Sequence, residues 1–512
     1  MPGLHTFYDG SLLLAPLVPF FGLDTDKLNL FFCQLFSVLL AFAFFKLFPP
    51  RQSSDHSVRL SILAFVGIAL CYFCFGRAIK HIFGLLLFSY VLLRFVPVRF
   101  VHRAVFCFAM GYLIFIHWYR WFILRDYHLD VTGPMMIMVQ KVTVLAFSLH
   151  DGSKKSEELS RILSKESLSK VPPILNFLAY TFQFQTVLTG PMVFYSEFME
   201  FVSGENFSKA LKKVDAIGAS ESSDTKLNNA SKNKRRHSPG GVSSLSMPSP
   251  VRAVLSKFLF AAFCAILLLL FGNSSDPAQI VSPWAWRMPW LQWLLLFWFL
   301  IFMQRVQYYY AWTMTDAICN ISGFGFDGFT SDGKPKWDLT TTVDVWKVET
   351  AQSFKETLDG WNLKTMFWLR YIAYERMPKN YRTLSTYALS AVWHGLFMGY
   401  YLCFATGALI TVAGRMSRRC IRHHFQRNTF LHHLYNLLTF LATKFALAYT
   451  TFPFVTMHLN PGLLLYRRLF FFLHFLALFA ILALPRLLPP ENHSPKQSEE
   501  AHKTKQRSAV IN

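Results

Sequence analysis

Long apolar runs, separated by short polar stretches, recur along most of the chain. A helix that crosses the hydrocarbon core of a bilayer needs about 20 mostly apolar residues, and many of the runs approach this length. The sequence therefore predicts an all-α polytopic membrane protein with a single membrane domain over residues 1–486. The runs occupy residues 28–45, 60–75, 82–95, 104–118, 135–149, 254–271, 284–303, 387–412, 433–454 and 469–484, and a further helix is expected from Pro173 to residue 188.

Two polar segments interrupt or end this pattern. Residues 204–250 are rich in serine, asparagine, lysine and arginine, a composition typical of disorder. Basic loops stay preferentially on the cytosolic side of a membrane. We therefore expect a disordered cytosolic loop at 204–250 and a disordered cytosolic tail at 487–512.

Loop charge also constrains how the chain crosses the membrane between Arg305 and Arg415. Both of these arginines lie in stretches that the positive-inside bias places in the cytosol. The apolar run that contains His394 therefore needs a second crossing before it, and the apolar candidate is the short run 363–373, headed by Asn362. Short segments at membrane depth are tolerated where they line a cavity or are buried in protein. We expect the Asn362 and His394 segments to form neighbouring walls of one interior cavity.

Composition supports a membrane protein and argues against nucleic-acid binding. Hydrophobic residues make up 53% of the 512 residues and charged residues only 16%, whereas a soluble domain has about 25% charged residues. The formal net charge of +22 is spread over short loops, which fits anionic lipid surfaces better than a nucleic-acid patch. Most of the eight cysteines lie within apolar runs, so no disulfide framework is indicated. The sequence lacks a metal-ligand constellation, so we expect neither a metal nor a bound cofactor.

A histidine and an asparagine at membrane depth could perform acyl transfer. A neutral imidazole can take the proton of a hydroxyl that attacks a carbonyl. An asparagine amide can stabilise the resulting oxyanion, a contribution of roughly 3–4 kcal/mol. His394 could equally form a helix–helix hydrogen bond, and Asn362 could be a helix cap. The residues alone leave both interpretations open.

Three segments together resemble the membrane-bound O-acyltransferase superfamily, most closely its lysophospholipid acyltransferase branch. They are the run 361–376 that begins Trp-Asn-Leu-Lys, the run 390–401 that reads Ser-Ala-Val-Trp-His-Gly-Leu-Phe-Met-Gly-Tyr-Tyr, and the run 309–326 before them. The resemblance implies His394 as the catalytic base and Asn362 as its supporting donor. It places expected substrate contacts at Trp361, Trp393, Tyr309, Trp312 and Asn320.

The same resemblance implies a fold, substrates and a location. The fold would be a bundle of roughly 9–11 transmembrane helices, with short re-entrant or amphipathic helices, around a central tunnel. The substrates would be acyl-CoA and a lysophospholipid with an ethanolamine, serine or choline head group, used in phospholipid remodelling in the endoplasmic reticulum membrane.

Other functions remain alternatives at this point. Related branches acylate a protein, a sterol or diacylglycerol. A transporter is a more distant alternative, which would place charged residues along a path and often contains inverted repeats. No internal repeat is evident in the sequence. A structural membrane protein would leave Asn362 and His394 replaceable by residues of similar size.

Overall fold

The computed structural model describes residues 9–50, 56–124, 129–212, 247–330, 332–426 and 428–490. Helices dominate these residues, and the only β pairing among them is an isolated bridge between Phe329 and Pro335. Six helices of the described chain are long and apolar enough to cross a membrane, or seven if the bent pair α19–α20 is one span. The predicted all-α polytopic membrane fold is thus confirmed, whereas the larger number of transmembrane helices and the central tunnel that the resemblance implies stay predictions.

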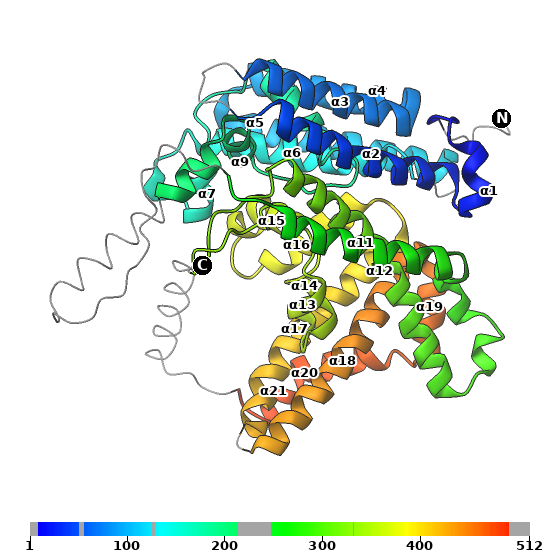
Figure 1. Ribbon diagram of the computed structural model, residues 1–512. Helices are drawn as coiled ribbons and strands as arrows, with labels where there is room; N and C mark the ends of the chain where they lie inside the picture. Colours follow the sequence, from blue (N-terminus) through cyan, green and yellow to red (C-terminus); the bar gives the residue numbers. More distant parts are fainter. Residues whose placement is uncertain are drawn as a thin grey trace, which may run out of the picture.

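The N-terminal half forms one layer of packed helices, blue to cyan in Figure 1. Within this layer α6 is the most enclosed of the candidate spans, with 83% of its apolar window buried. Close approach between helices is possible where side chains are small: a Cβ on Gly67 of α3 would lie 1.5 Å from the carbonyl oxygen of Phe182. The helices of this half are α1 (Val18–Phe21), α2 (Thr25–Leu47), α3 (Ser57–Phe75), α4 (Ile79–Phe95), α5 (Val98–Tyr119), α6 (Thr132–Asp151), α7 (Arg161–Lys165), α8 (Ile174–Phe182) and α9 (Tyr195–Ser203).

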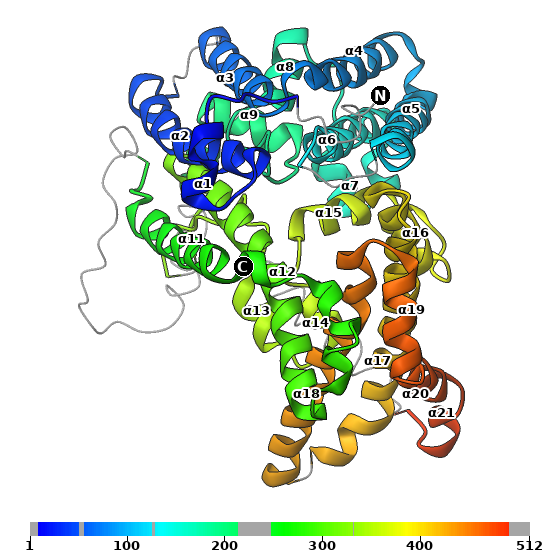
Figure 2. The ribbon, with the colours of Figure 1, turned by 90° about the vertical axis from the view of Figure 1, so that its right-hand side faces the viewer.

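The C-terminal half forms an arm that extends away from this layer (Figures 1 and 2). Both views place α15 and α16 between the N-terminal layer and the long helices α17 and α18. The helices of this half are α11 (Val251–Phe271), α12 (Trp290–Ile321), α13 (Val345–Thr350), α14 (Phe354–Leu358), α15 (Leu363–Ile372), α16 (Arg382–His394), α17 (Met398–Phe425), α18 (Thr429–Thr456), α19 (Leu459–Arg468), α20 (Phe472–Leu482) and α21 (Leu484–Leu487).

Three predicted runs differ in extent from the helices that form. The run after Pro173 was expected to stay helical to residue 188, but α8 ends at Phe182 because the ammonium of Lys141 hydrogen-bonds the carbonyls of Tyr180 and Thr181. The run 284–303 continues as α12 to Ile321, buried among protein partners. The run 469–484 begins as α20 only at residue 472, after a bend of 74° from α19.

The run 387–412 is not one continuous span, which corrects the prediction for the histidine segment. α16 ends at His394 and α17 begins at Met398. Gly395 separates them with a φ of 128°, a conformation that residues with side chains rarely adopt. The histidine therefore lies at a helix end rather than in the middle of a helix.

The predicted disordered segments fall mostly outside the described residues. Residues 205–212, at the start of the predicted loop 204–250, are helical and so do not fit that prediction. The described chain stops at residue 212, resumes at 247 and ends at 490. The rest of the loop and most of the tail 487–512 lie outside it.

Candidate active site

Asn362 caps the N-terminus of α15 from a left-handed backbone conformation. Its φ of 42° and ψ of 56° lie in a region that asparagine tolerates better than most residues. Its Oδ1 accepts a hydrogen bond from the amide of Thr365 at 3.4 Å. The amide of Leu363 donates to the carbonyl of Thr342 at 2.7 Å and fixes the turn. Within the described ranges the side-chain Nδ2 of Asn362 has no hydrogen-bond partner, so this donor is available to a bound molecule.

His394 is the last residue of α16, and aromatic rings surround its imidazole. The ring centroids of Phe454 and Phe404 lie 4.9 and 5.4 Å from that of His394, and the ring of Tyr400 lies at 5.9 Å. The side chain itself is half-buried. The rings thus shield the imidazole from bulk water and leave part of it accessible. Phe404 and Tyr400 come from α17 and Phe454 from α18, so three helices build this enclosure.

Two neighbouring turns of α6 form hydrogen bonds with the asparagine segment and the histidine segment. Gln140 Nε2 donates to Thr365 Oγ1, one turn into α15, at 3.0 Å. Trp393 Nε1, next to the catalytic-base candidate, donates to the carbonyl of Met136 at 3.1 Å. Met136 and Gln140 are four residues apart, which is about 6 Å along a helix axis. The two segments are therefore neighbours, as the loop charges predicted, whereas the interior cavity expected between them stays a prediction.

Further contacts fix the end of α16. Trp368 of α15 is fully buried, and its ring lies 5.6 Å from that of Trp393. Its Nε1 donates to Thr143 Oγ1 of α6 at 3.0 Å. On the other side, His117 Nε2 of α5 hydrogen-bonds the carbonyl of Trp393 at 3.2 Å. Helices α5, α6 and α15 together set the position of the histidine.

Three of the expected substrate residues form one aromatic cluster. The ring of Trp361, just before α15, lies 5.0 Å from Trp312 and 5.9 Å from Tyr309, both on α12. Tyr308 completes the cluster at 5.6 Å from Trp361. We call these four residues the aromatic wall. Because Trp361 precedes Asn362 directly, the wall adjoins the candidate donor.

Asn320 is not part of the aromatic wall. It is fully buried near the end of α12, eleven residues after Tyr309, which is about 16 Å along a helix. Its Nδ2 donates to the carbonyl of Trp337 at 3.2 Å. A Cβ on Gly325 would lie 1.7 Å from its Oδ1. Asn320 therefore holds the loop that follows α12.

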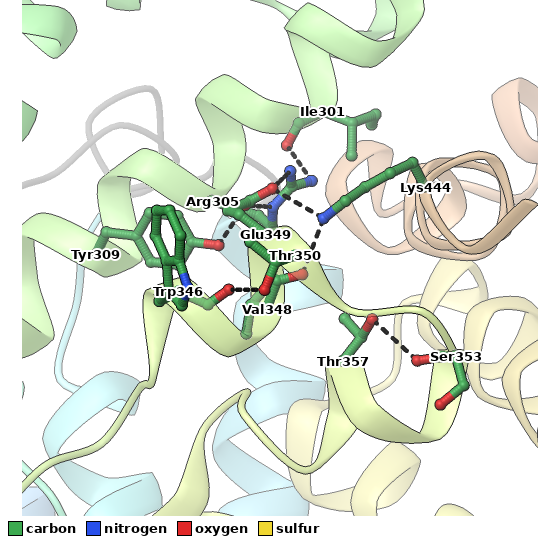
Figure 3. A network of polar contacts seen from close by, with 10 residues as sticks. All are labelled: Ile301, Arg305, Tyr309, Trp346, Val348, Glu349, Thr350, Ser353, Thr357 and Lys444. Atoms are coloured by element: carbon green, nitrogen blue, oxygen red, sulfur yellow. Dashed lines mark hydrogen bonds and ion pairs between the residues drawn. The ribbon is translucent and has the colours of Figure 1, made fainter. Parts of the chain in front are cut away.

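Glu349 joins the aromatic wall to two buried cations (Figure 3). Its carboxylate accepts hydrogen bonds from the Tyr309 hydroxyl at 2.6 Å and from Arg305 at 2.8 and 3.0 Å. Lys444 of α18 donates to the same carboxylate at 3.1 Å and to the carbonyl of Val348 at 2.8 Å. Burial opposes ionisation of Glu349, but the charge and hydrogen bonds of Arg305 outweigh it and hold the pKa of the carboxyl below its usual value.

Sequence reasoning missed Glu349, although a signal for it existed. Lys444 lies inside the predicted run 433–454, and a cation at that depth normally has a partner. Thr365 and Trp368 had no comparable signal. Their partners Gln140 and Thr143 are each 225 residues away in sequence.

The arrangement suits proton transfer and oxyanion stabilisation. It provides an imidazole, a free amide donor and an aromatic surface. The described residues contain no group of three or more histidine, cysteine, aspartate or glutamate side chains that could hold a metal ion.

Comparison with known families identifies the reaction class. The family model described as MBOAT, membrane-bound O-acyltransferase family, matches residues 116–452. The chain belongs to this family. The matched range contains Asn362, His394, the aromatic wall and Glu349. Membership makes the protein a multi-pass membrane acyltransferase and disfavours the transporter and structural alternatives.

Individual relatives agree with this assignment over nearly the whole chain. The chain is 37% identical over 499 residues to lysophospholipid acyltransferase 6 of Drosophila melanogaster, covering 94% of this chain but 64% of the fly protein. It is 35% identical over 506 residues to membrane-bound glycerophospholipid O-acyltransferase 1 of Mus musculus, covering 98% and 97% of the two chains. A lysophospholipid acyltransferase of Saccharomyces cerevisiae is 30% identical over 508 residues, covering 91% and 75%.

Proposed function

We propose that the protein transfers a fatty acyl group from acyl-CoA to the free glycerol hydroxyl of a lysophospholipid. The acceptor would carry an ethanolamine, serine or choline head group. The names of the similar fly and yeast proteins support a lysophospholipid as the acceptor, and the name of the mouse protein supports the glycerophospholipid class. Within the molecule, the observation that carries the proposal is the attachment of both motif segments to adjacent turns of α6.

In the proposed reaction His394 is the base. Its neutral imidazole takes the proton of the lysolipid hydroxyl as that oxygen attacks the thioester carbon. The Nδ2 of Asn362 donates a hydrogen bond to the oxyanion that forms. The intermediate collapses, the carbon–sulfur bond breaks, and the CoA thiolate takes the proton back from the imidazolium. The products are a diacyl phospholipid and free CoA, and no cofactor is required.

The aromatic residues are proposed to position the substrates. Trp361 and Trp312 are partly exposed beside the donor amide, the buried ring of Tyr309 supports Trp361 from the interior, and Trp393 lies beside the base. Flat aromatic surfaces can bury an acyl chain or a pantetheine arm at low entropic cost. The contacts of Asn320 favour a supporting role in the loop after α12.

The proposed setting is the endoplasmic reticulum membrane. Acyl-CoA is water-soluble and would come from the cytosol, whereas the lysophospholipid would diffuse within the bilayer. This arrangement suits the replacement of acyl chains in existing phospholipids.

Microsomes that contain the wild type or a single variant test the proposal. Labelled oleoyl-CoA is offered with a panel of lysophospholipids, and protein levels are matched. His394→Ala should abolish transfer, and Asn362→Ala should lower it by about 10²- to 10³-fold. His433→Ala, which changes an exposed histidine on α18, is the control and should be fully active.

Two results would contradict the proposal in different ways. Full activity of a well-expressed His394→Ala protein would rule out the base assignment. Wild-type transfer to a sterol, diacylglycerol or peptide, but to no lysolipid, would instead move the protein to another branch of the family.

A further inference from the structure

The end of the α17–α18 hairpin that the positive-inside bias places in the cytosol carries a row of arginines. Arg415, Arg418, Arg419 and Arg422 follow the spacing i, i+3, i+4, i+7, which places them on one side of α17. We call this row the arginine face. The first three side chains are exposed, and Arg422 is half-buried.

No acidic residue lies near the arginine face in sequence. Between residues 376 and 490 the chain contains neither aspartate nor glutamate. Among the residues that the structure describes, none of the four arginines forms an ion pair. Their charge is therefore not neutralised by the described part of the protein.

The opposite side of α17 is occupied by the protein itself. Ala413 and Cys420 are buried in a cluster with Ala477 of α20 and Leu484 of α21. α17 thus cannot rotate to bury its arginines without exposing this cluster. Figure 1 shows the hairpin as part of an arm that extends away from the N-terminal layer, with α20 and α21 beside it.

The depth of the arginine face follows from the antiparallel partner helix. Arg415 precedes the end of α17 by ten residues, which is about 15 Å along the axis. Leu438 follows the start of α18 by nine residues, about 14 Å, and is 52% exposed. Leu437 and Leu441 beside it are each 54% exposed on a helix apolar enough to span a membrane. The arginine face therefore begins level with lipid-facing leucines and continues toward the hairpin tip.

We propose that the arginine face binds the head groups of anionic phospholipids in the cytosolic leaflet. Arginine forms bidentate hydrogen bonds with phosphate oxygens. Basic clusters just cytosolic of a membrane span attract anionic lipids. Lipid that contacts the exposed leucines lies at the same depth as the start of the arginine face, so a head group reaches the arginines by lateral diffusion. This lipid is a bound partner, separate from the proposed substrate.

Lipid retention by the purified full-length protein tests this assignment. The protein in neutral detergent micelles is mixed with phosphatidylserine or phosphatidylcholine, and retained lipid is counted by native mass spectrometry. The wild type should retain more phosphatidylserine than phosphatidylcholine. The variant R415Q/R418Q/R419Q should bind it at least about fivefold more weakly, the factor expected for one basic side chain at an anionic surface.

A second triple variant is the matched control. K154Q/K155Q/R161Q removes three exposed cations from a segment between α6 and α8 that also carries Glu157 and Glu158, so their charge is locally balanced, and it should retain phosphatidylserine like the wild type. Thermal unfolding of all proteins checks that they are folded.

Three outcomes would overturn the assignment. The first is an equal loss in both triple variants, which would indicate a general effect of net charge. The second is unchanged retention in R415Q/R418Q/R419Q. The third is displacement of phosphatidylserine by acyl-CoA, together with a raised KM for acyl-CoA in that variant, which would make the arginine face a coenzyme A phosphate site.

Discussion

At the scale of single residues, Asn362 combines a structural and a proposed chemical role. Its Oδ1 caps α15, its backbone adopts a left-handed conformation, and its Nδ2 is the proposed oxyanion donor. The motif directed attention to this residue, but a sequence does not reveal a φ of 42°. Three substitutions separate these roles. Glycine keeps the left-handed backbone, aspartate keeps the capping oxygen without the amide donor, and alanine keeps neither the cap nor the donor.

Asn362→Gly should lower kcat by about 10²- to 10³-fold, because an oxyanion donor is lost. Its unfolding temperature should change little, because glycine accepts the left-handed backbone and is a tolerable cap. Asn362→Ala should show the same loss of activity and also lose about 1–2 kcal/mol of stability. Kinetics and thermal unfolding in detergent measure the two effects.

Asn362→Asp is the control for the donor role. It keeps the capping oxygen and the side-chain size but has no amide hydrogen. A kcat within tenfold of the wild type in this variant would show that the amide donor is not needed.

At the scale of helices, α6 contributes no proposed reacting group but sets the spacing of those that react. Its hydrogen bonds to Thr365 and Trp393 attach two helices that are otherwise joined by a turn. A displacement of about 1 Å in a catalytic group can cost about 10²-fold in rate. The spacing is therefore as important for turnover as the identity of the reacting side chains.

Gln140→Leu should destabilise the protein by about 1–3 kcal/mol, because the buried hydroxyl of Thr365 loses its partner. It should also lower kcat, by about tenfold or more, as α15 shifts. In the double variant Gln140→Leu/Thr365→Val both polar groups are gone, so much of the stability should return while the activity stays low. A single variant with wild-type stability and kcat would show that α6 does not set the spacing.

The apolar pattern predicted many helices well. It failed where contacts with residues far away in the sequence determine where a helix ends. It located α2, α3, α4, α6, α11 and α18 to within a few residues, since a long apolar run forms a helix that satisfies its own backbone hydrogen bonds. It extended α8 too far, because the lysine that caps its carbonyls is about 40 residues away. It also missed the break at Gly395, where a Cβ would lie 3.2 Å from the ring of His117 on α5.

At the scale of the whole molecule, Glu349 connects parts of the C-terminal half that are far apart in sequence. Its carboxylate lies between α12 and α18 and hydrogen-bonds Tyr309 of the aromatic wall (Figure 3). One carboxylate thus serves two cations, Arg305 and Lys444. The motif resemblance indicated the asparagine and the histidine, whereas Glu349 could have been inferred only from the unpaired lysine in the predicted span.

Glu349→Ala should destabilise the protein by about 3–5 kcal/mol, because it leaves two buried cations without their counter-ion. Glu349→Ala/Lys444→Met should recover part of this loss, since one of the cations is removed. Thermal unfolding of the purified proteins measures both effects. Equal stability of Glu349→Ala and the wild type would mean that the network contributes nothing to the fold.

The contribution of the Glu349 network to stability should fall on acidification. The pKa of Glu349 is lower in the folded protein than its usual value. Its contribution to stability is therefore complete above the usual pKa and is lost as the pH falls through the lowered pKa. Glu349→Gln should lack this loss on acidification.

The attachment of α16 to α6 uses a main-chain group, and this has a consequence for how the sequence can change over time. Trp393 bonds the carbonyl of residue 136, which every amino acid supplies, whereas Thr365 bonds the side chain of Gln140. Position 136 is also only partly buried. Replacement of residue 136 by another amino acid leaves the histidine in place, whereas replacement of residue 140 alters the placement of the asparagine. Two positions one turn apart on the same helix thus face very different limits on the replacements that descendants of this protein can accept.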